Sequence, residues 1–228
     1  MPEEISKTRL SARVVLAAAG YGAVLFLPAG TVYWIEGWLF MTFLSVYFVY
    51  STLWLMKNNP ELLKERSRTR NTQKWDKIIL FLFAICLVAL ISMPGFDMRY
   101  QWTPLKVPII IEVFAFGGLF ISFIIIFLVI KENTYASRSV KIQEEREHRV
   151  VTTGPYKYVR HPMYGGGIGV LLCIPLALGS LYTLIPGVLC VILFVFRTHL
   201  EDRMLREELP GYREYADKTR YRLFPGIW

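Results

Sequence analysis

The sequence predicts an all-α fold, a polytopic bundle of about five to six transmembrane helices, and three observations support this prediction. Hydrophobic residues make up 54% and aromatic residues 15% of the 228 residues, which is too apolar for an ordinary soluble domain. Apolar runs of about 20 residues, the length that crosses a bilayer as an α-helix, recur along the chain. The basic residues gather in the polar segments between these runs.

Six apolar segments are the candidate spans, at residues 11–31, 35–56, 78–95, 107–130, 163–180 and 182–200. The first has no small-residue cleavage site and is followed at once by the second, so we expect a span and no cleaved signal peptide. Pro175 and Pro186 interrupt the last two, which only a short link at 179–182 separates. These two form either a tight hairpin of two helices or a partly broken pair that does not cross fully.

The distribution of charge predicts the orientation of the bundle. Of the 26 Lys and Arg residues, 24 lie in the N-terminal segment, in 57–77, in 131–160 or after 196, while Arg99 and Lys106 would lie on the opposite side. Because cytoplasmic loops carry an excess of basic residues, we expect both termini and the longer polar segments to be cytoplasmic. Anionic membrane lipid and this bias explain the net charge of +8 without nucleic acid.

We divide the chain into residues 1–130, an N-terminal region of about four transmembrane helices, and residues 131–228, which carry a helical hairpin, a cytoplasmic tail and the candidate site. No internal repeat is visible, so a repeat-built transporter gains no support. The three cysteines lie inside apolar segments without paired spacing. They therefore suggest neither a disulfide framework nor a zinc site.

The most informative segment runs from Gly154 to Gly166 and reads GPYKYVRHPMYGG. A simple membrane anchor would need none of its Arg, His, Pro or Tyr residues. A helix is expected to begin near Pro162, and its first-turn amides favour an anionic group nearby. The glycines at 165–167 would allow a ligand or a neighbouring helix to approach closely, and helix packing alone would also explain them.

A second group of polar residues lies at the end of the last span. On a helix Arg197, Glu201, Leu205 and Glu208 share one face. They would form either a solvated helix end, with an ion pair worth a few tenths of a kcal/mol, or part of a site. Arg197 follows a continuous apolar run, and a charge at the centre of a membrane costs about 2.5–3.5 kcal/mol. We therefore expect Arg197 to point into the bundle.

These segments carry a family resemblance. The chain resembles the isoprenylcysteine carboxyl methyltransferase family, within the wider phospholipid methyltransferase group, in three blocks. These are HRVVTTGPY at 148–156, RHPMYG at 160–165, and Arg197 with Glu201, Asp202, Leu205 and the YREY of 212–215. The resemblance covers Val140 to the C-terminus. Residues 59–66 and the Trp-Asp-Lys of 75–77 also resemble the first cytoplasmic loop of prokaryotic members.

The resemblance implies a membrane methyltransferase that uses S-adenosylmethionine without a Rossmann domain, with residues 131–228 as its catalytic region. A lipid-like acceptor would enter a cytoplasmic pocket from the bilayer. Arg197 would bind the acceptor, Glu201 would bind the methionine moiety of the cofactor, and both count as catalytic. The implied cofactor contacts are Gln143, His148, Arg149, Val150, Val151, Tyr156, His161, Pro162, Met163, Tyr164 and Glu201.

The sequence does not identify the chemical class of the methyl acceptor. The family's named substrate is an isoprenylcysteine carboxylate, and the alternatives are a phospholipid amine or a small thiol. Asp202 stands where many relatives have a second Glu, and there is one residue fewer than usual between Leu205 and Tyr212.

A different class of function is also open, a non-catalytic transporter or scaffold with a degenerate site. For a reductase, the sequence contains no residues that would select a nicotinamide cofactor. No metal is expected, because His148 and His161 are thirteen residues apart without a carboxylate or Cys at ligand spacing.

Overall fold

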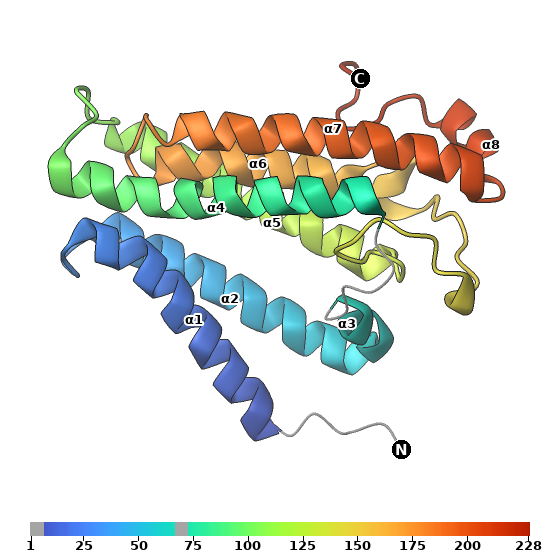
Figure 1. The fold of residues 1–228 in the computed structure, drawn as a ribbon, viewed down its shortest axis with the longest axis horizontal. Helices are drawn as coiled ribbons and strands as arrows, with labels where there is room; N and C mark the ends of the chain where they lie inside the picture. The colour runs from blue at the N-terminus through green and yellow to red at the C-terminus, as the bar shows by residue number, and fades with distance from the viewer. Residues whose placement is uncertain (1–6, 67–72) are drawn as a thin grey trace.

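The computed structural model describes residues 7–66 and 73–228, and within them regular structure is entirely helical, as predicted. The long helices after residue 73 lie roughly parallel, the first long helix runs obliquely to them, and short helices and loops gather at one end (Figure 1). The α-helices are α1 (Lys7–Ala29), α2 (Ile35–Asn58), α3 (Pro60–Arg66), α4 (Lys74–Tyr100), α5 (Ile109–Glu132), α6 (Pro162–Ala177), α7 (Leu184–Glu208) and α8 (Tyr212–Lys218). Two 3-10 helices, η1 (Glu144–Arg146) and η2 (Gly154–Lys157), lie between α5 and α6.

Every predicted span lies on a helix, but the helices differ in length. Helices α2, α4, α5 and α7 are long and apolar enough to cross a membrane, whereas α6 and the 18–29 part of α1 are shorter apolar helices. The 16 residues of α6 span only about 24 Å, less than the roughly 30 Å of a hydrocarbon core. The last two segments thus form a hairpin of one short and one long helix.

Helix α7 continues to Glu208, well past the predicted end at 200. Its last two turns read EDRMLREE, and Glu, Arg, Met and Leu are good helix formers. Burial of Asp202 on this part of α7 adds tertiary contacts that hydropathy does not report. The extension carries the polar residues of α7 beyond the apolar run while keeping them on one rigid element.

Close helix packing positions the hairpin. Helix α5 packs along α6, and α4 packs along both α1 and α7. A Cβ atom placed on Gly166 of α6 would lie 3.1 Å from the Ser122 carbonyl oxygen of α5, so only glycine permits this approach. Gly165 and Gly167 lie just as close to the tail and to Phe194. Protein packing therefore accounts for the glycine run noted in the sequence.

The two ends of the bundle differ in character. At one end the buried Asp97 accepts hydrogen bonds from the Thr103 amide at 2.7 Å and from Ser180 Oγ. This contact ties the connection between α4 and α5 to the turn between α6 and α7. At the other end lie α3, the 133–161 segment, α8 and the tail (Figure 1). Most of the polar chain outside the long helices is therefore at one end.

Candidate functional site

A cavity of about 480 Å³ opens at the polar end of the bundle. Its walls come from α4, α5, α6 and α7, from the 133–161 segment and from α8. Ten predicted site residues line it: His148, Arg149, Val150, Val151, Tyr156, His161, Met163, Tyr164, Arg197 and Glu201. The two blocks recognised in the sequence thus meet around one space.

Gln143 and Pro162 do not line this cavity. Gln143 is 1% exposed, and its amide donates to the Tyr135 carbonyl oxygen at 2.8 Å and accepts from Arg146 at 2.8 Å. These contacts use the Gln143 side chain to brace its own loop. Pro162 is the first residue of α6, where its fixed φ and missing amide suit the start of a helix. Both residues thus lie outside the cavity lining, Gln143 within its own loop and Pro162 at the start of α6.

Arg197 points into the bundle, as its place after an apolar run predicted. Its Nε donates to Asp76 Oδ1 at 2.7 Å, and its Nη2 donates to Asp76 Oδ2 at 3.2 Å and to the Arg138 carbonyl oxygen at 2.7 Å. Asp76 has no solvent exposure, and it also accepts from the Val140 amide at 2.9 Å. Bidentate pairing of this kind fixes the guanidinium plane as well as compensating its charge.

Glu201 lies one turn beyond Arg197 on α7 and shares its neighbour Tyr164. The Tyr164 hydroxyl donates to Glu201 Oε2 at 2.5 Å, while Arg197 Cζ lies 5.6 Å from the centre of the Tyr164 ring. Phe194 packs edge-on against the same ring at 5.2 Å. A carboxylate, a guanidinium and a phenol therefore converge at the junction of the polar and apolar parts of the cavity.

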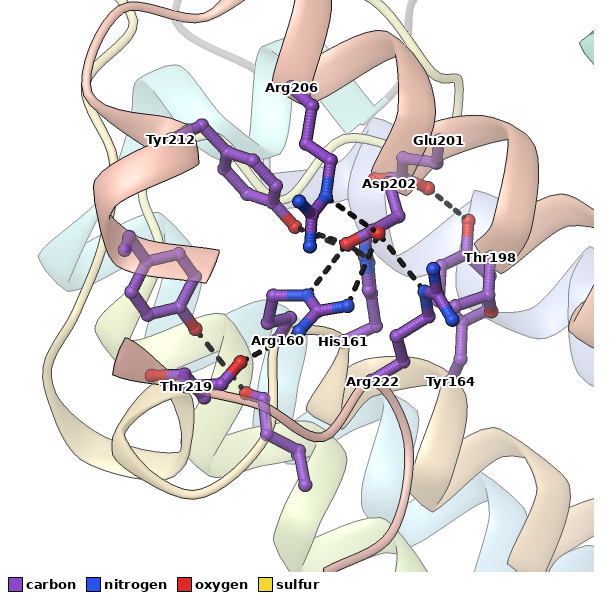
Figure 2. A network of polar contacts seen from close by, with 12 residues as sticks. Arg160, His161, Tyr164, Thr198, Glu201, Asp202, Arg206, Tyr212, Thr219 and Arg222 are labelled. Atoms are coloured by element: carbon purple, nitrogen blue, oxygen red, sulfur yellow. Dashed lines mark hydrogen bonds and ion pairs between the residues drawn. The ribbon is translucent and has the colours of Figure 1, made fainter. Parts of the chain in front are cut away.

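Asp202 is the centre of a buried network that sequence reasoning noted only as a departure from the family pattern (Figure 2). Its side chain is 2% exposed, and it accepts from Arg160 Nε at 2.7 Å, Arg222 Nε at 3.0 Å and the Tyr212 hydroxyl at 3.0 Å. His161 Nε2 and Arg206 Nε lie 3.3 Å from the same carboxylate. Burial, followed by the negative charge of Asp202, raises the pKa of Tyr212, so the phenol stays protonated and donates.

The network ties the C-terminal tail to the wall of the cavity. The backbone amides of Arg160 and His161 donate to the carbonyl oxygens of Tyr221 and Arg222 at 2.9 and 2.8 Å. Arg160 Nη1 also reaches the Thr219 carbonyl oxygen at 2.7 Å. The tail is thus held against the RHPMYG segment by backbone and side-chain hydrogen bonds.

His148 leaves a polar atom unsatisfied inside the site. Its Nδ1 is buried and has no hydrogen-bond partner among residues 7–66 and 73–228. The ring lies over Tyr135, with the two ring centres 4.4 Å apart. Burial, with a smaller effect of the Arg146 charge, lowers the pKa of His148 to about 4, so the imidazole is neutral near pH 7. A buried polar atom without a partner is costly unless a ligand or water satisfies it.

The part of the chain that the structure describes contains no group of three or more His, Cys, Asp or Glu side chains placed to bind a metal ion. Two charged side chains at the cavity, Arg197 and Arg160, are instead joined in ion pairs with Asp76 and Asp202. The site can therefore offer fixed hydrogen-bond donors, one carboxylate in Glu201 and an apolar wall.

Comparison with known proteins assigns this region to a family. No curated protein matches the chain significantly. The family model described as phospholipid methyltransferase matches residues 110–210, which run from α5 through the RHPMYG segment and α6 to the end of α7. That match includes every residue predicted for the site. Residues 110–210 therefore match the phospholipid methyltransferase family, the group of membrane methyltransferases that includes the isoprenylcysteine carboxyl methyltransferases.

Proposed function

We propose that this chain is an integral membrane, S-adenosylmethionine-dependent methyltransferase that acts on the carboxylate of a lipid-like, isoprenylcysteine-type acceptor. The observation that carries the proposal is the convergence of Arg197, Glu201 and Tyr164 at the point where a polar cavity meets an apolar wall. The family match supports methyl transfer in a membrane. The active site and both termini would be cytoplasmic.

The cavity suits S-adenosylmethionine in size and in chemistry. Its volume of about 480 Å³ lies within the range of small-molecule sites. The Glu201 carboxylate would bind the ammonium group of the cofactor, and the unsatisfied His148 Nδ1 is free to accept a hydrogen bond. The residues that would hold the cofactor are His148, Arg149, Val150, Val151, Tyr156, His161, Met163, Tyr164 and Glu201. When bound, S-adenosylmethionine supplies an electrophilic methyl group on a sulfonium.

Arg197 would orient the acceptor. Its hydrogen bonds to described residues use Nε and Nη2, which leaves the two Nη1 hydrogens for an incoming carboxylate. Because Asp76 fixes the guanidinium plane, the acceptor oxygen would be held in one orientation. Positioning of this kind can account for a large part of a rate enhancement, and a carboxylate nucleophile needs no general base.

The apolar wall would exclude water from the reacting groups. Phe83 on α4 stacks on Phe194 of α7 with ring centres 4.6 Å apart, and Phe194 in turn contacts Tyr164. Methyl transfer from a cation to an anion consumes charge, so removing water from the two groups favours the transition state.

An amine of a phospholipid headgroup is a second candidate acceptor. The observation that favours it is the pairing of Arg197 with Asp76, which cancels the positive charge at the acceptor position. A site without net positive charge is better suited than an unpaired arginine to a headgroup ammonium, which becomes the neutral amine nucleophile when it loses a proton. Under this alternative Arg197 would be dispensable and the Asp76 carboxylate would matter more.

Two measurements test the proposal. Calorimetry of the purified protein with S-adenosylmethionine should show saturable binding that Glu201→Gln weakens and the exposed Arg203→Gln leaves unchanged. Incubation with methyl-labelled S-adenosylmethionine and host lipid extract should then give a labelled lipid. Base-labile label would indicate an ester, and base-stable label a nitrogen or sulfur acceptor. Absence of saturable binding would favour a transporter or scaffold instead.

A further inference from the structure

Residues 221–228 differ in character from the chain just before them. They read YRLFPGIW and contain one charged residue, whereas the eight residues before them, REYADKTR, contain five. The exposed side chains of 213–220 are all charged, but beyond that point they include Tyr221, Phe224 and Ile227, which are 39%, 37% and 80% exposed. A boundary between water and lipid suits charged surface on one side and apolar and aromatic surface on the other.

The segment folds back beside the apolar part of the α6–α7 hairpin. Figure 1 shows the chain end near α7, displaced from α8 toward the middle of the row of helices. Leu223 is buried in a cluster that also contains Trp228, with Tyr164 and Ile168 of α6 and Val191, Phe194 and Val195 of α7. Val191 lies six residues before Arg197, which is about 9 Å along the axis of α7. The segment is therefore level with apolar side chains of a helix long enough to cross a membrane.

The backbone of the segment forms several of its hydrogen bonds internally. The amides of Arg222 and Leu223 donate to the main-chain oxygen of Trp228 at 2.6 and 3.2 Å, and the Ile227 amide donates to the Phe224 carbonyl oxygen at 3.3 Å. A loop next to lipid needs such internal partners, because less water is available there to satisfy its polar groups. The backbone conformation thus suits a position at the edge of the membrane.

The single charge of the segment is compensated inside the protein. Arg222 Nε donates to Asp202 Oδ2 at 3.0 Å, and Arg222 Cζ lies 4.7 Å from the centre of the Trp228 ring. This charge therefore does not oppose contact between the segment and lipid. The same ion pair connects the segment to the site, because Asp202 also contacts Arg160 and His161, which both line the cavity.

We propose that residues 221–228 are a membrane-interface segment: bilayer lipid covers Phe224 and Ile227, and this contact holds Arg222 against Asp202. The interface is the expected depth, because Trp and Tyr rings favour it and a non-helical loop does not enter the hydrocarbon core exposed to lipid. Contact with the bilayer would thereby support the wall of the cavity at Arg160. The proposal requires that the chain lies in a membrane, and it depends on neither the cofactor nor the acceptor.

Fluorescence quenching tests where the segment lies. A maleimide fluorophore is attached to Ile227→Cys or, as the matched control, to Glu214→Cys on the exposed face of α8, in protein reconstituted into phosphatidylcholine nanodiscs. A phospholipid with a nitroxide near the top of its acyl chain should quench the label at 227 severalfold more than the label at 214, and aqueous iodide should show the reverse order. Equal quenching at the two positions would overturn the proposal. A label at 227 shielded from both quenchers would show a protein partner on this surface and would also overturn the lipid assignment.

Proteolysis tests whether lipid contact holds the segment in place. Because Ile227 is 80% exposed, Ile227→Asp removes little protein packing, and its effect reports on the contact with lipid. In nanodiscs we expect trypsin to cleave after Arg220 and Arg222 severalfold faster in Ile227→Asp than in wild type, whereas the apolar Ile227→Leu should match wild type. An unchanged rate in Ile227→Asp would overturn the link between lipid contact and the position of Arg222. Neither test uses S-adenosylmethionine, so the outcome is independent of the proposed function.

Discussion

Asp202 stabilises the site because its carboxylate is the shared counter-charge of several cationic side chains. Its carboxylate contacts the side chains of Arg160, His161, Arg206, Tyr212 and Arg222, and three of these partners are always cationic. In Asp202→Asn the buried Arg160 would lose its counter-charge, and the partly exposed Arg206 and Arg222 would lose theirs as well. Removing one partner of a buried ion pair costs about 3–5 kcal/mol.

We therefore expect Asp202→Asn to lower the midpoint of thermal unfolding strongly. Arg203→Ala is the matched control on the next residue of α7, because its pair with Glu207 is exposed and such pairs contribute about 0.3–0.5 kcal/mol. Circular dichroism of the detergent-solubilised protein measures both midpoints. Equal midpoints for the two variants would contradict the role of Asp202 as the centre of the network.

Asp76 is a positioning residue, because it acts on the acceptor only through Arg197. Asp76→Asn keeps the shape and an acceptor for the Val140 amide but removes the charge that fixes the guanidinium. We expect kcat to fall about 100-fold, as for a small misplacement of a reacting group, while calorimetry finds an unchanged affinity for S-adenosylmethionine. If the cofactor affinity fell in parallel with kcat, Asp76 would have a general structural role instead.

The neutral His148 predicts a loss of stability in acid. Its pKa is lowered to about 4, below the usual value near 6.5, so the folded chain holds the imidazole neutral while the unfolded chain protonates it first. This contribution is fully present above about pH 6.5 and is lost as the pH falls toward 4. The drop in unfolding midpoint between pH 7.5 and pH 5 should be smaller in His148→Asn than in wild type. His199→Gln, at an exposed histidine, should retain the full drop.

At the scale of single residues, the sequence predicted where a side chain points better than it predicted which residue that side chain pairs with. The apolar run before Arg197 indicated that this residue points inward, since a charge there needs a polar environment. Its partner Asp76 lies 121 residues earlier, and no local pattern connects the two. Asp202 was visible only as a departure from the family pattern, because its importance arises from the tail folding back onto it.

At the scale of elements, periodicity and hydropathy predicted the helices, and packing decided their ends. The predicted helix start near Pro162 is confirmed, because proline at the first position is a strong local signal. The end of α7 at Glu208 was not predicted, since contacts with the tail and with α8 stabilise turns that apolarity alone does not favour.

The contact between α5 and α6 provides a prediction for an element. In Gly166→Ala the new methyl group would meet Ile126 at 2.9 Å and the Ser122 carbonyl oxygen at 3.1 Å, and backbone cannot move aside cheaply. Such overpacking costs about 1–3 kcal/mol. Gly117→Ala on α5 is the matched control, because nothing lies within 4 Å of the added methyl. Thermal unfolding should show a lower midpoint for Gly166→Ala and an equal or higher midpoint for Gly117→Ala, and the reverse order would contradict the packing described.

At the scale of the whole molecule, the two ends of the bundle differ in structure: one is closed by a polar contact, and the other contains the candidate site. The Asp97 contact closes one end with short connections, whereas the other end carries the cavity, the ion pairs and the tail (Figure 1). Because the cavity continues between α4, α5 and α7, the proposed acceptor would keep its hydrocarbon chain among helices long and apolar enough to cross a membrane, while its polar group met the proposed cofactor.

This arrangement predicts which end of the bundle faces the cytoplasm. Of the basic residues that the structure describes, only Arg99 and Lys106 lie near the Asp97 end, so the positive-inside rule predicts that the cavity end faces the cytoplasm, where the proposed cofactor would be available. Leu105, 72% exposed, and the exposed Glu214 mark the two ends. In intact cells an impermeant maleimide should label Leu105→Cys at once and Glu214→Cys only after permeabilisation. The native cysteines do not confuse the result, since none is exposed: Cys190 is buried, and Cys86 and Cys173 are partly buried in apolar helices. Labelling of Glu214→Cys before Leu105→Cys would reverse the orientation and place the site on the wrong side of the membrane for a cytosolic cofactor.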